Sequence, residues 1–180
     1  ADAGADKLKA MVDDTTGTKD FSTVAKVTGS VDDILAIVRD GQTTLKAGVE
    51  FKATDAGTAA EIGEIKAATS GIVEATVSDK DMTTLLDATS GLVAQGASAT
   101  DKLTIALDDT SATAANLLAL NSVTSLAVDA SKVDTLSGTY SDISAVLTDE
   151  QAGEVNLGAG VDLSVSAATS SPTITEINTL

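Results

Sequence analysis

The sequence predicts an α/β fold, a repeat solenoid in which short parallel strands alternate with short helices. Three observations predict it: a recurring helix-start phrase, runs of alternating apolar and polar residues ahead of several copies of the phrase, and a near-regular interval between copies. Self-similarity at an interval of roughly 20–50 residues is typical of stacked repeat architectures. A β-rich sandwich or a β-solenoid is the alternative.

The helix-start phrase is clearest where Gly and a Ser or Thr precede an acidic residue and Ile. It occupies Gly29–Ile34, Gly57–Ile62 and Gly138–Ile143, and looser copies begin at three further positions. A Ser, Thr or Asp side chain just before a helix accepts a hydrogen bond from an early helical amide, and a following carboxylate reaches back. We therefore expect helices to begin at or within two residues of the following caps: Ser30, Thr58, Asp81, Thr113, Thr139 and Thr173.

Runs of strict alternation predict the strands. Apolar residues occupy every second position in 49–53, 73–77, 103–107 and 161–165, and 126–133 is a shorter fifth candidate. A period of two turns one face of a strand toward the core and the other toward solvent or a partner. The residues expected inside are Val49, Phe51, Val73, Val77, Ile105, Leu107 and Leu163.

The predicted caps follow one another at intervals of 23 to 34 residues, enough for one strand, one helix and a return loop. Strands connected in the same direction through a helix must be parallel, with right-handed crossovers. We assign residues 1–23 to an N-terminal segment or cap and residues 24–180 to a solenoid of about six strand–helix units. The last copy, from Thr173 to Leu180, stops inside its apolar stripe. We expect another module or a second copy to cover it.

The composition argues against most enzyme classes and several classes of partner. The 180 residues include no His, Cys or Trp, which removes the usual base at neutral pH, the thiolate nucleophile and the commonest transition-metal ligands. A net charge of −16 with one arginine argues against nucleic acid and anionic lipid. No apolar run is long enough to span a membrane. We expect no enzyme activity, no catalytic residues and no residues that bind an organic cofactor.

Aspartates follow several predicted strands and suggest a metal. They are Asp55, Asp79 and the adjacent pair Asp108 and Asp109. Neighbouring parallel strands lie about 4.8 Å apart, so carboxylates stacked at their ends would repel one another. A hard cation such as calcium, bound between them, would relieve that repulsion. The other interpretation is that these residues make turns and favour the start of the next helix. Neither an EF-hand loop nor a glycine-rich calcium nonapeptide occurs.

The copies TGSVDDI, AGTAAEI and SGTYSDI, with strands such as VEATVSD, resemble the degenerate Thr/Ala/Asp-rich repeat modules of giant bacterial cell-surface proteins of the marine cyanobacterial type. The resemblance covers about residues 24–180. It implies secretion to the cell surface or the extracellular space and a surface or filament role, and it implies no particular site.

Two functions fit these observations. The first is a structural, non-catalytic subunit or module of an extracellular surface layer, filament or adhesin, which associates with itself or with neighbouring modules through its repeat ends. The second is a discrete receptor- or glycan-binding module of a surface or phage fibre. Ordered assembly in electron micrographs favours the first, and monodisperse monomers or trimers favour the second.

Overall fold

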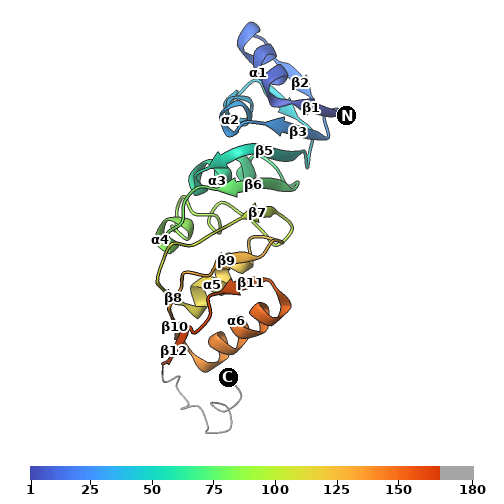
Figure 1. Ribbon diagram of the computed structural model, residues 1–180. Helices are drawn as coiled ribbons and strands as arrows, with labels where there is room; N and C mark the ends of the chain where they lie inside the picture. Colours follow the sequence, from blue (N-terminus) through green and yellow to red (C-terminus); the bar gives the residue numbers. More distant parts are fainter. Residues whose placement is uncertain (167–180) are drawn as a thin grey trace.

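The computed structural model describes residues 1–166, which form an elongated α/β body with β1 at one end and β12 at the other (Figure 1). The described helices are α1 (Ala5–Asp14), α2 (Val31–Arg39), α3 (Ala59–Ala67), α4 (Met82–Leu85), α5 (Ala114–Asn121) and α6 (Tyr140–Ala152). The described strands are β1 (Asp2–Gly4), β2 (Lys19–Phe21), β3 (Lys26–Gly29), β4 (Thr43–Leu45), β5 (Glu50–Gly57), β6 (Val73–Val77), β7 (Lys102–Thr104), β8 (Ser111–Thr113), β9 (Val128–Ala130), β10 (Thr135–Gly138), β11 (Val155–Leu157) and β12 (Asp162–Val165). The predicted α/β class is confirmed.

Every pair of strands in the described part of the chain is parallel, as expected for strands connected through helices. The largest sheet has the order β1-β3-β5-β6-β7, and a second has the order β12-β10-β8. Two further pairs, β2-β4 and β11-β9, form separate two-stranded sheets, and of their four strands the sequence predicted only β9, within 126–133. Strands β2, β4 and β11 have three residues each, too few for alternation to be recognised.

Five predicted helix starts are confirmed. Ser30, Thr58, Asp81, Thr113 and Thr139 each immediately precede a helix, and each side chain accepts a hydrogen bond from the amide three residues later. At Thr58 the Glu61 carboxylate also reaches back to the cap amide, which completes a capping box. The predicted start at Thr173 lies outside the described residues. Helix α1 was not predicted, because it follows Gly4 without a side-chain cap.

The core lies between the helices and the strands and consists mainly of aliphatic side chains. The isoleucine of each clear phrase, Ile34, Ile62 and Ile143, is fully or almost fully buried. Six of the seven strand residues expected inside are buried, and Leu163 is the exception. Its side chain is 39% exposed. Strand β12 is an edge strand that pairs only with β10 among the described strands, so no other described strand covers its outer side.

The glycine of the phrase lies against the first residue of the preceding helix. A Cβ at Gly29 would lie 2.4 Å from the Cβ of Ala5, and one at Gly57 would lie 3.0 Å from Cγ2 of Val31. Gly138 stands in the same relation to Ala114, at 3.2 Å. Real Cβ contacts are essentially never as short as the first of these distances. The phrase therefore begins with glycine because successive helix starts approach one another closely.

Burial of Ile105 supports a stability prediction. Its side chain is 1% exposed, whereas Thr104 beside it in the chain is exposed. Ile105→Asp would bury an unpaired charge, and we expect a loss of at least about 4 kcal/mol, enough to unfold a marginally stable chain. Thr104→Asp is the matched control and should change the free energy of unfolding by less than about 0.5 kcal/mol. Urea denaturation followed by circular dichroism measures both, and equal losses would contradict the prediction.

Candidate functional site

Three of the predicted metal ligands bind the starts of helices. Asp55 accepts a hydrogen bond from the amide of Val31 at 2.8 Å, and Asp79 accepts one from the amide of Ala59 at 2.7 Å. These amides belong to the first residues of α2 and α3, so each carboxylate serves the helix that precedes it in the chain. The first amides of a helix lack partners within the helix and favour a negative charge.

Asp109 repeats this arrangement at 2.8 Å with the amide of Met82, the first residue of α4. These aspartates therefore bind helix starts at three positions, as the second interpretation expected, but each bound helix precedes its aspartate in the chain instead of following it. The fourth predicted ligand behaves differently. Asp108 forms an exposed ion pair with Lys132 at 2.6 Å, and this hydrogen bond lowers the pKa of the Asp108 carboxyl.

Within residues 1–166 no three acidic side chains come close enough together to hold a metal ion. The strand-end aspartates lie in successive turns of the chain. An oxygen of each accepts a hydrogen bond from a backbone amide or from a lysine. Calcium binding by Asp55, Asp79, Asp108 and Asp109 stays a prediction, and its test is given below.

A buried polar cluster that the sequence did not reveal surrounds Asp101. This side chain is fully buried and pairs with the buried amine of Lys66 at 3.1 Å. Its carboxylate also accepts hydrogen bonds from the amides of Val73 and Ser98. Because every oxygen has a partner, the carboxylate joins the start of β6 to the segment before β7. Asp101 follows Ser, Ala and Thr, a context that does not distinguish it from an exposed aspartate in a turn.

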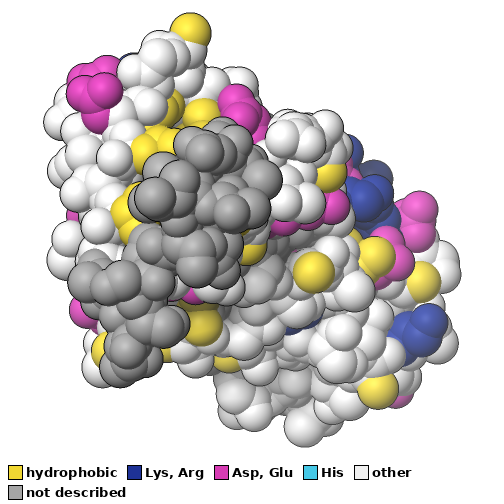
Figure 2. Space-filling model, turned by 90° about the horizontal axis from the view of Figure 1, so that it is seen from below, with side chains coloured by type: hydrophobic (Ala, Val, Ile, Leu, Met, Phe, Trp, Pro, Cys, Tyr) yellow, Lys and Arg dark blue, Asp and Glu magenta, His cyan; other side chains and the backbone are white. Residues whose placement is uncertain are grey.

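The solvent face of the largest sheet carries paired charges. Lys52 lies opposite Glu74, and Glu74 lies opposite Lys102 in the parallel register. Lys52 donates a hydrogen bond to Glu74, which lowers the pKa of the Glu74 carboxyl. Seen from the C-terminal end, Lys and Arg side chains gather on one side of the body with acidic side chains among them (Figure 2). On the sheet, the charges of Lys52, Glu74 and Lys102 partly offset one another, although the whole chain carries −16.

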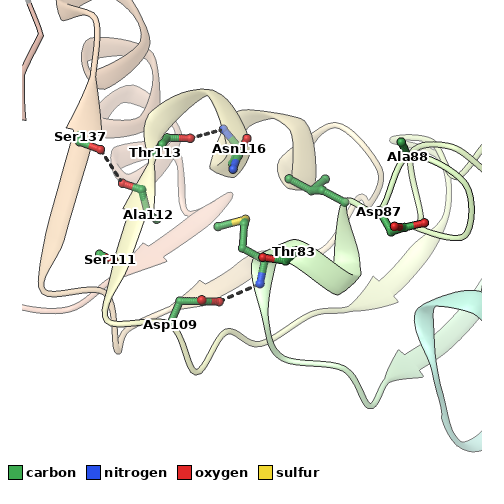
Figure 3. A pocket seen from close by; sticks show the side chains of 11 residues that line it. Thr83, Asp87, Ala88, Asp109, Ser111, Ala112, Thr113, Asn116 and Ser137 are labelled. Carbon is green, nitrogen blue, oxygen red and sulfur yellow. Dashed lines mark hydrogen bonds between the residues drawn. The ribbon is translucent and has the colours of Figure 1, made fainter.

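A groove of about 600 Å³ lies beside α4, where the row of helices is interrupted. Helix α4 has four residues, whereas α3 has nine and α5 has eight. Side chains from α4, the loop after it, β8, α5 and β10 border the space that the missing turns leave open (Figure 3). The lining residues are Met82, Thr83, Leu86, Asp87, Ala88, Asp109, Ser111, Ala112, Thr113, Asn116 and Ser137.

Some polar groups of the groove are engaged within the protein. Thr113 accepts a hydrogen bond from the amide of Asn116, and Ser137 donates one to the carbonyl of Ala112 at 3.3 Å (Figure 3). Asp87 accepts hydrogen bonds from Thr89 and Ser90, which lower the pKa of its carboxyl far below the ordinary range. Its carboxylate is therefore negatively charged at neutral pH.

Three other side chains of the groove have no protein partner among residues 1–166. They are the hydroxyls of Thr83 and Ser111 and the side-chain amide of Asn116. The sequence analysis did not single them out, because isolated Ser, Thr and Asn residues occur throughout this chain. In the structure the three residues line the same groove beside the short α4. They can donate and accept hydrogen bonds to a ligand.

Comparisons of the chain with protein-family models, with curated proteins and with known structures find no match. None of the helices in residues 1–166 is both long enough and apolar enough to cross a membrane.

The contact between Asp79 and Ala59 generates a second prediction. Asp79→Ala removes the acceptor for the first amide of α3, and we expect a loss of about 1 kcal/mol in the free energy of unfolding. Asp79→Asn keeps an acceptor oxygen and should lose less. The control is Asp134→Ala, because this exposed carboxylate accepts no hydrogen bond from the described residues. Equal losses in Asp79→Ala and Asp134→Ala would show that the contact contributes nothing.

The calcium prediction is tested by thermal unfolding in EDTA and in millimolar calcium. A ligand that binds only the folded chain raises the midpoint by mass action, so bound calcium should raise it. The quadruple replacement of Asp55, Asp79, Asp108 and Asp109 by Asn should abolish the rise. Magnesium at the same concentration controls for general screening of the charge of −16. An unchanged midpoint across the calcium series would overturn the prediction.

Proposed function

We propose that this chain is a structural, non-catalytic module of an extracellular surface layer, filament or adhesin. In this proposal it is a repeat solenoid of strand–helix units that joins neighbouring modules through its ends. The recurrence of one order of elements supports the solenoid: β3, α2 and β4 are followed by β5 and α3, and β10, α6 and β11 by β12. Residues 1–23 hold β1, α1 and β2 in the same order and pair in parallel with β3 and β4.

The observation that carries the proposal is that one unit supplies a hydrogen-bond acceptor to the helix start of the unit before it. Helices α2, α3 and α4 each receive an acceptor for their first amide from an aspartate in the following turn of the chain. The phrase glycines add a close contact in the same direction, from one unit to the helix start before it. A unit of this kind has two different faces, and contacts between different faces generate open arrays rather than closed dimers.

Edge strands supply a surface for such contacts. Among the described strands, β1 pairs only with β3, and β12 pairs only with β10. An edge strand presents unpaired amide and carbonyl groups that another chain can pair with. The predicted burial of residues 173–180 against a second copy falls on residues outside those the structure describes.

The lack of His and Cys supports a non-catalytic role, because these residues supply most general bases and thiolate nucleophiles. Several carboxylates serve the architecture instead: Asp55, Asp79 and Asp109 accept from helix starts, and Asp101 is buried in an ion pair. Secretion and a surface location rest on the resemblance of the repeats alone.

Assembly is tested by light scattering coupled to size-exclusion chromatography and by negative-stain microscopy over a range of protein concentration and salt. We expect head-to-tail oligomers that grow with concentration. Because a charge of −16 makes copies repel one another, assembly should increase as salt screens that charge. A monodisperse monomer at high concentration in both low and high salt would overturn the proposal.

A matched pair of variants locates the contact. Leu163 in β12 is 39% exposed and Leu126, away from both edge strands, is 40% exposed. Leu163→Lys should weaken assembly and Leu126→Lys should leave it unchanged, while both keep the melting midpoint of the monomer. Equal effects on assembly would exclude the β12 edge as the contact.

A further inference from the structure

We propose that the groove beside α4 binds a neutral, hydroxyl-rich ligand, a short saccharide. In this groove, polar side chains from α4, β8 and α5 that have no protein partner among residues 1–166 line one space. Its volume of about 600 Å³ lies within the range of small-molecule sites, which is roughly 300–1,000 Å³.

The lining combines an apolar base with polar walls. Met82, Leu86 and Ala112 supply apolar surface, and Met82 and Ala112 are themselves buried. Polar side chains from α4, β8, α5 and β10 surround them (Figure 3). A sugar ring is likewise divided into apolar and polar surface, because its C–H groups form an apolar face and its hydroxyls project around the rim. Ligand sites generally pair apolar surface with a few placed polar groups in this way.

The unpartnered groups suit hydroxyls in particular. Thr83 and Ser111 each offer a hydroxyl that donates and accepts, and the Asn116 amide offers two donors and an acceptor oxygen. A sugar hydroxyl also donates and accepts, so it can satisfy either kind of group. An oxygen of Asp109 is engaged with the Met82 amide, which fixes this carboxylate at the groove wall.

The charge of the groove selects against other ligands. Asp87 and Asp109 line it, and no Lys or Arg does, so phosphate and sulfated sugars would meet repulsion. A metal ion is disfavoured because the described residues bring no three acidic side chains together. A neutral saccharide meets neither obstacle.

The groove is separate from the surfaces proposed for assembly. It lies between α4 and α5, whereas the edge strands β1 and β12 lie at the two ends of the described body (Figure 1). The saccharide site therefore does not depend on the assembly proposal. In an array, each copy would present one groove, and linked sites raise the overall affinity for a polymeric glycan without new contacts.

The test is saturation-transfer NMR on the full chain with maltose, cellobiose and N,N′-diacetylchitobiose, followed by calorimetric titration of the disaccharides that bind. The groove variant is Ser111→Ala with Asn116→Ala. The control variant is Ser141→Ala with Ser164→Ala, which likewise removes polar side chains from a helix start and a strand at exposed positions without protein partners. Melting midpoints establish that both variants fold.

We expect at least one neutral disaccharide to bind. Because two hydrogen bonds to the ligand are lost, the groove variant should bind it at least about tenfold more weakly, and the control should bind it as the parent does. Absence of binding by all three disaccharides would overturn the proposal. Equal binding by the groove variant and the parent would place any binding elsewhere and would also overturn it. Binding of calcium or of a sulfated disaccharide at the groove, without a neutral one, would replace the proposed ligand class.

Discussion

The arrangement of this chain depends on how closely successive helix starts approach one another. Parallel strands pair about 4.8 Å apart, but a helix with its side chains is about 10 Å across. Only the first residue of each helix can follow the strand spacing, and the small residues Gly29 and Ala5 meet at this point. The same proximity lets an aspartate of one turn of the chain reach the first amide of the helix before it, as Asp55 reaches Val31.

The acidic character of the chain has a partly architectural origin. A helix start favours a negatively charged partner, so an array of helices favours one acidic residue for each helix. Asp55, Asp79 and Asp109 meet it from the following turn, while Asp81 meets it at its own helix. Abundant aspartate therefore does not by itself indicate a metal. The residual negative charge keeps separate copies apart and makes any contact between them sensitive to salt.

Interruption of a repeat creates the features that resemble a site. Helix α4 ends after one turn, and the long connection that follows it carries Asp87 and the buried Asp101. The same interruption opens the groove beside α5, where the Asn116 side chain has no hydrogen-bond partner among residues 1–166.

By itself, the sequence determined the α/β class, five helix starts and most of the inward strand residues, because caps such as Thr58 and alternation such as Val73 to Val77 are local signals. Only the tertiary structure decided which distant groups meet. Three-residue strands such as β2 have no local pattern, and Asp101 differs from a surface aspartate only through Lys66, 35 residues away. Exposure of Leu163 likewise depends on what lies beside its strand, since an alternating pattern specifies a face but not whether a neighbour covers it.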